Sequence, residues 1–153
     1  VLLLANDAMI RVEIESRRGA LSSRQKHVRV LNCECGEKLA NADFDTQAAW
    51  TLGTGWSIVG GAAIKAAGIT SDIEQPFAFV DGGLYRIEVV LSQVTAGSVR
   101  VRLAGTTSID GVARNANGTF IDTLTAAGHT ALRITADAAF AGRIERVSLR
   151  RLA

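Results

Sequence analysis

Apolar and polar residues alternate with a period of two along much of this chain. In residues 85–91 every second side chain, from Tyr85 to Leu91, is apolar. The same alternation recurs in residues 10–15, 28–30, 99–103 and 132–134. Side chains of a β-strand point to opposite faces in turn, so the pattern predicts strands with one buried face and one exposed face. No stretch shows a sustained 3.6-residue period, and we therefore expect no substantial helix.

Glycine turns separate these runs. The chain has fifteen glycines and a single proline. Turn signals occur at Asp81-Gly82-Gly83, Ala96-Gly97, Asp110-Gly111, Asn117-Gly118 and Ala127-Gly128. Intervals of about 8–16 residues between turns are typical of antiparallel sandwiches. The sequence therefore predicts an all-β chain.

The 153 residues divide into two parts of different character. Residues 1–38 hold two polar strands, at 10–15 and 28–30, and predict a β-hairpin or an extended arm. Residues 39–153 hold the regular series of short strands and predict one sandwich of ordinary domain size. An isolated polar hairpin has marginal stability, so we expect the arm to dock on neighbouring subunits by strand addition. The apolar residues that would dock are Ile10, Val12, Ile14, Val28 and Val30.

A series of short motifs after residue 39 carries a resemblance to a known kind of domain. The motifs are NADF at 41–44, WTLGTGWSI at 50–58, GG at 60–61, QPF at 75–77, GLYRIEV at 83–89, VTAGSV at 94–99, NGTF at 117–120, LRITA at 132–136 and FAGRIERVSL at 140–149. Over about residues 39–150 they resemble jelly-roll β-sandwiches of the carbohydrate-binding-module type. Domains of this type occur in bacteriophage virion proteins and in secreted glycan-active proteins.

Together with the predicted arm, the resemblance implies a non-enzymatic structural protein of a bacteriophage virion. It would be a decoration, head-fibre or tail-associated subunit, homo-oligomeric, assembled in the bacterial cytoplasm and located in the virion. The jelly roll would project outward and contact host glycans. The alternative is a carbohydrate-binding module of a secreted bacterial protein, which would bind sugar in isolation through an exposed aromatic residue near a groove.

Cys33 and Cys35 are the two cysteines of the chain. Residues two apart on a strand face the same side about 7 Å apart, which is at or beyond the limit for a disulfide between them. Three alternatives stay open: reduced thiols, disulfides within or between chains, and a metal site. Zinc needs four ligands, and His27 is the one nearby supplement. Disulfides between subunits would lock an assembly after its release into an oxidising medium.

The resemblance also implies a candidate calcium site. Jelly-roll binding modules often hold a structural Ca²⁺ near the first and last strands, and carboxylate oxygens suit that ion. The matching residues are Asp43, Asp45 and Glu145. Apart from this candidate, we expect no metal or cofactor.

Five charged residues occupy outward positions of three predicted strands: Arg86, Glu88, Arg100, Arg102 and Arg133. If those strands are neighbours, the side chains form one charged face. That face either pairs opposite charges across strands or binds a partner or an acidic glycan through arginine. We expect the eight aromatic residues to fill the core. Because none joins the charged set, stacking on sugars or on nucleic-acid bases is disfavoured.

The remaining features exclude several classes of protein. The net charge of +2, from 17 basic and 15 acidic residues, gives no sign of a nucleic-acid partner. No run approaches the roughly 20 apolar residues of a membrane-spanning helix. His27 and His129 lie in different regions, and neither a nucleophile elbow nor a nucleotide-binding glycine motif is present. We therefore expect a protein that is not an enzyme and has no nucleic-acid or membrane partner.

Overall fold

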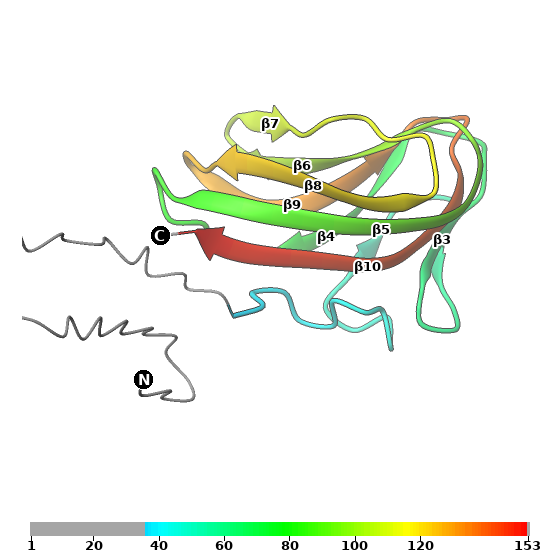
Figure 1. Cartoon of the computed structure of the whole chain (residues 1–153), viewed down its shortest axis with the longest axis horizontal. Coiled ribbons are helices and arrows are strands. Elements are labelled where there is room, and N and C mark those ends of the chain that lie inside the picture. Colours follow the sequence, from blue (N-terminus) through cyan, green and yellow to red (C-terminus); the bar gives the residue numbers. More distant parts are fainter. Residues whose placement is uncertain (1–35, 153) are drawn as a thin grey trace, which may run out of the picture.

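The computed structural model describes residues 36–152, which form two packed antiparallel sheets of five strands each (Figure 1). Sheet A has the order β2 (Trp56–Ile58), β3 (Ala63–Lys65), β10 (Ala141–Leu152), β5 (Leu84–Ala96) and β8 (Gly118–Thr125). Sheet B has the order β1 (Thr51–Leu52), β4 (Ser71–Pro76), β9 (His129–Ala136), β6 (Val99–Gly105) and β7 (Ser108–Asp110). The prediction of an all-β sandwich is confirmed. The described part contains no helix, and so none that could cross a membrane.

The chain winds between the two sheets in the manner of a jelly roll. Only β2–β3 and β6–β7 are consecutive strands of one sheet, and every other connection between the described strands crosses to the opposite sheet. Neighbouring strands are antiparallel throughout. This winding places residues that are close in sequence on opposite surfaces of the sandwich, which matters for the charged residues below.

The core lies between the sheets and follows the predicted alternation. In β5 every second residue from Tyr85 to Leu91 is buried, and β6 and β9 face it with Val101 and Ile134. All eight aromatic residues of the chain pack in the core or against it: Phe44, Trp50, Trp56, Phe77, Phe79, Tyr85, Phe120 and Phe140. The prediction that the aromatic residues fill the core is confirmed.

The segment 36–50 closes one side of the sandwich. Its backbone runs beside β10, where the Lys38 amide donates to the Leu149 carbonyl at 2.9 Å and the Val147 amide donates to the Ala42 carbonyl at 3.0 Å. Gln75 of sheet B reaches the same segment through hydrogen bonds to the backbone of Ala40. These contacts begin at Glu37, whose carboxylate accepts from the Leu149 amide, two residues before the domain start expected at 39. The five apolar arm residues assigned to docking lie outside the described residues.

Candidate functional site

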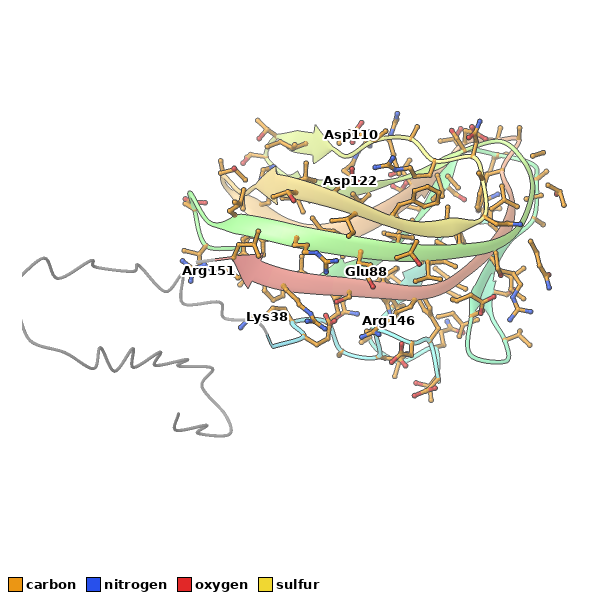
Figure 2. The ribbon with its side chains drawn as sticks, in the orientation of Figure 1. Lys38, Glu88, Asp110, Asp122, Arg146 and Arg151 are labelled. Carbon is orange, nitrogen blue, oxygen red and sulfur yellow. The ribbon has the colours of Figure 1, made fainter. Side chains whose placement is uncertain are left out.

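The structure separates the five charged residues that were expected to share a face. Arg86 and Glu88 lie on β5 in sheet A, whereas Arg100, Arg102 and Arg133 lie on β6 and β9 in sheet B. The chain crosses from one sheet to the other between β5 and β6, so outward positions on these two strands belong to opposite surfaces. Figure 2 shows Glu88 beside β5 and Asp110 near β7, on the two different sheets. The expectation of a single five-residue face is therefore corrected to two faces.

On sheet A the two charges form a closed pair. The Arg86 guanidinium donates to the Glu88 carboxylate at 2.7 Å, and both side chains are half-buried. Each charge is thus satisfied by its neighbour on the same strand. This pairing lies within one strand, so it differs from the cross-strand pairing of opposite charges that the structural interpretation expected.

On sheet B the charges form a row across four strands. Strand register places Arg133 of β9 directly between Glu74 of β4 and Arg102 of β6. Two arginines opposite one another repel, but each has a carboxylate on its other side. Arg133 bonds to Glu74, and Arg102 donates from Nη2 to Asp110 of β7 at 3.0 Å. The order of charges along the row is negative, positive, positive, negative.

Ion pairing favours the charged form of Asp110, the carboxylate at the β7 end of this row. The hydrogen bond from Arg102 is the largest influence on Asp110 and holds the pKa of its carboxyl below the usual value. The same bond raises the pKa of Arg102. Arg100 adds a second cation, with its Nε 3.2 Å from the Asp110 carboxylate. Asp110 is therefore an anion that two arginines share, which sequence reasoning did not anticipate because it lies on a three-residue strand.

A polar hollow opens beside Arg100 on the outer face of sheet B. It measures about 360 Å³ including its open mouth, and it is lined by Thr70, Ser98, Arg100, Thr135 and Asp137. Thr135 is only 6% exposed, and its hydroxyl has no hydrogen-bond partner among the described residues. A buried polar group normally has a partner. The hollow is thus lined by charges of both signs, Arg100 and Asp137, beside a buried hydroxyl, with no aromatic ring in its lining.

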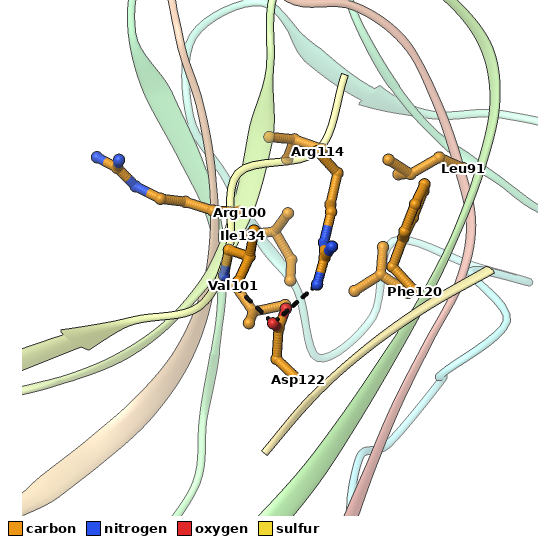
Figure 3. Close-up of a pocket in the computed structure, with 10 residues that line it drawn as sticks. Leu91, Arg100, Val101, Arg114, Phe120, Asp122 and Ile134 are labelled. Atoms are coloured by element: carbon orange, nitrogen blue, oxygen red, sulfur yellow. Dashed lines mark hydrogen bonds and ion pairs between the residues drawn. The ribbon is translucent and has the colours of Figure 1, made fainter. Parts of the chain in front are cut away.

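A second hollow lies between the sheets beside β8, and Arg114 is one of the residues that line it (Figure 3). The Arg114 guanidinium donates from Nη2 to Asp122 at 3.0 Å, and its Cζ lies 5.0 Å from the centroid of the Phe120 ring. The Val112 amide donates to the same carboxylate at 3.2 Å. These contacts hold the loop 111–117 across the gap between β6 and β8.

The candidate calcium ligands do not come together. Asp43 lies 3.3 Å from the Arg146 guanidinium, and Glu145 lies 3.2 Å from that of Arg143. Asp45 is exposed. Among residues 36–152 no three His, Cys, Asp or Glu side chains form a group that could hold a metal ion.

Within residues 36–152, His129 is the one histidine and there is no cysteine, so these residue types form no metal or catalytic cluster there. His129 is buried, and its Nδ1 accepts from the Ala127 amide at 2.8 Å while its ring packs against Phe79. These contacts give it a structural role in the sandwich. His27, Cys33 and Cys35 fall outside the described residues, so the three alternatives for the cysteines stay open.

No protein-family model and no curated protein matches the chain. Among solved structures, the fold is similar to part of the enzymatically active domain of tailspike protein 4 of bacteriophage CBA120, with a TM-score of 0.53 and 12% identity. That match covers 75% of this chain and 21% of the other, so this chain spans about a fifth of the tailspike chain. A CBM4 structure aligns with a TM-score of 0.46 and 15% identity, over 73% of this chain and 98% of the other. The likeness to the tailspike domain concerns the fold alone.

Proposed function

We propose that the chain is a non-enzymatic structural subunit of a bacteriophage virion, of the decoration, head-fibre or tail-associated kind. In this proposal residues 1–38 dock on neighbouring subunits and the sandwich projects from the assembly. The main support for this proposal is the location of the aromatic residues, because all eight pack in the core or against it. A module that recognises neutral sugars usually presents aromatic rings for stacking, and a spacer has no need of them.

The charges on the described surface support the same role. Arg86, Arg102 and Arg133 each bond to a carboxylate of the sandwich itself. A hydrolase would instead need carboxylates, or a nucleophile and its base, directed into a cleft. A surface whose charges are satisfied internally suits a subunit that repeats many times on a particle. The occurrence of this fold within a bacteriophage tailspike domain is consistent with such a setting.

Particle association tests the proposal. The full chain is produced together with the phage that encodes it, and particles are purified on a density gradient before quantitative mass spectrometry. We expect the chain in the particle band at a fixed copy number per major capsid or tail protein. Absence from purified particles, with the chain recovered only as free protein, would contradict the proposal.

Arm variants test the docking role. The triple variant Ile10→Ser, Val12→Ser and Ile14→Ser removes the apolar side of the first predicted arm strand, and we expect it to lose particle association. The matched control changes the intervening residues by Arg11→Gln, Glu13→Gln and Glu15→Gln, which keeps the apolar positions. Equal incorporation of the two variants would show that this strand does not dock.

The hollow beside Arg100 favours a second candidate function, a carbohydrate-binding module. Its lining carries charges of both signs, from Arg100 and Asp137, which would bind the hydroxyl groups of a glycan through hydrogen bonds. A glycan array of the full chain separates the two candidates, since a purely architectural subunit gives no signal. Any binding at this site should fall in Arg100→Gln and persist in Arg86→Gln, whose arginine lies on the opposite sheet.

A further inference from the structure

Among residues 36–152, strand β8 is the longest of the four sheet edges. It pairs with β5 along its whole length, from Leu84 opposite Thr125 to Leu91 opposite Gly118, without a register shift. On its other side the described residues provide no strand, and no backbone hydrogen bond links residues 118–125 to the adjoining loop. The other three sheet edges are β1, β2 and β7, which have two, three and three residues, against eight in β8.

The outer side of β8 carries no lysine, proline or bulge, which are among the features that protect natural sheet edges, together with an inward-pointing charge or a covering loop. Its one charged residue, Asp122, points inward and is paired with Arg114 of the loop 111–117. The outward side chains of β8 are uncharged and β-branched, namely Thr119, Ile121, Thr123 and Thr125. Ile121 is 48% exposed, and Val112 of the loop bound to Asp122 is 56% exposed. A strand whose outward face is uncharged, with exposed aliphatic side chains on and beside it, is suited to pairing with another strand.

We propose that β8 pairs antiparallel with β8 of a second copy of this chain, so that the two five-stranded sheets A become one continuous sheet. A twofold axis makes the contact self-complementary and closed. Self-pairing brings together only threonine and isoleucine on the outer face, so no like charges meet there. The outward face of β8 is therefore chemically complementary to the same face of a second copy.

The charges select the position of the twofold axis. An axis near the middle of β8 passes through either Ile121 or Asp122, because directly opposed residues must share a face. An axis at Asp122 would set the two Asp122 carboxylates opposite each other, and like charges in that position are destabilising. An axis at Ile121 instead pairs Ile121 with its own copy and Thr119 with Thr123 of the second copy. We therefore place the axis at Ile121.

Solution mass is the first test of the dimer. The full chain is measured by sedimentation equilibrium with a thiol reductant present, so that cysteines contribute no covalent link. We expect twice the 16.2 kDa chain mass. Ile121→Lys sets two ammonium groups opposite each other at the axis and should give the monomer mass with unchanged circular dichroism. Ile69→Lys, at a 54% exposed position in the β3–β4 connection, is the matched control and should stay dimeric.

Crosslinking then tests the register. In a Cys33→Ser, Cys35→Ser background, Ile121→Cys should form a disulfide-linked dimer on mild oxidation. Thr123→Cys should not, because its partner across the axis is Thr119. Efficient crosslinking through Thr123→Cys with none through Ile121→Cys would overturn the assigned register.

Three results would overturn the β8 contact itself. The first is a wild-type chain that remains monomeric at millimolar concentration. The second is an oligomer of any size that Ile121→Lys leaves intact, which would assign assembly to another surface. The third is a monomer whose β8 amides are protected from hydrogen exchange on both sides of the strand, which would mean that another segment of the same chain covers the edge.

Discussion

Gln75 holds Ala40 by both ends of its side-chain amide. Its Nε2 donates to the Ala40 carbonyl at 2.8 Å, and its Oε1 accepts from the Ala40 amide at 2.8 Å. Gln75 belongs to β4 of sheet B, whereas the segment around Ala40 hydrogen-bonds to β10 of sheet A. One buried side chain thus joins the two sheets through a segment 35 positions earlier in the chain.

We expect Gln75→Ala to lower the free energy of unfolding by about 2 kcal/mol, because two backbone groups lose their partners. For a domain of this size the melting temperature should fall by roughly 4–8 °C. Urea unfolding of the full chain measures the first quantity and calorimetry the second. Gln47→Ala removes an exposed amide from the same region and is the control. A Gln75→Ala protein as stable as the control would show that the contact does not hold the sheets together.

The Arg114–Asp122 pair should be worth more than an exposed ion pair. Asp122 is 11% exposed at its side chain and accepts from both Arg114 and the Val112 amide. We expect Asp122→Ala to cost about 2 kcal/mol, since it leaves a part-buried guanidinium and an amide without an acceptor. In a double-mutant cycle with Arg114→Ala, the coupling energy should be about 1 kcal/mol.

The Arg86–Glu88 pair supplies the comparison for that cycle. Its two side chains are 31% and 23% exposed, and pairs of this kind contribute about 0–1 kcal/mol. Measured by the same urea unfolding, its coupling energy should be the smaller of the two. Equal couplings would mean that Arg114 does not secure the loop 111–117.

Period-two alternation predicted the strands at 85–91, 99–103 and 132–134 and the face that each of them buries, but not the sheet to which each strand belongs. Arg86 and Arg100 both point outward as predicted, yet they lie on opposite surfaces because the turn at 97–98 carries the chain from one sheet to the other. Alternation specifies the inner and outer side of each strand. Strand order depends on contacts between distant residues, which the local pattern does not contain.

The same reasoning fails where the strand itself is irregular. Ile144 and Val147 are both fully buried although they are three positions apart. A bulge between Ile144 and Arg146 shifts the register with β5 and resets the alternation. The burial of the Thr135 hydroxyl could not be predicted from the sequence either, because the position of Thr135 between Arg100 and Asp72 depends on strand register.

Acid should weaken the fold partly through Asp137. Burial alone would raise the pKa of its carboxyl, but hydrogen bonds from the Ser98 hydroxyl and amide and from the Ala139 amide outweigh burial and lower the pKa. A lowered folded-state pKa contributes stability above the unfolded value, which is about 3.9. That contribution is lost as the pH falls through the folded value.

Asp137→Asn should therefore be less stable than wild type at pH 7 and lose less stability between pH 5 and pH 2. Urea unfolding at a series of pH values measures both effects. Asp45→Asn removes a carboxylate from an exposed turn and controls for the change in net charge. If Asp137→Asn and wild type lose the same stability in acid, the bonds to Ser98 do not favour the charged carboxylate.

Gly97→Ala should be among the most damaging single substitutions in the sandwich. Gly97 lies in the turn from β5 to β6 with a φ of +68°, and an added Cβ would overlap the Phe140 amide nitrogen and the Asp137 carboxylate. We expect a loss of at least about 3 kcal/mol, since the methyl group displaces backbone as well as straining φ. Gly82→Ala is the matched control, because its φ of +73° imposes the same strain while no atom lies within 4 Å of the added Cβ. It should cost only about 1 kcal/mol. Similar losses for the two variants in urea unfolding would mean that strain in φ alone, and not the close approach of the Phe140 backbone, requires glycine at position 97.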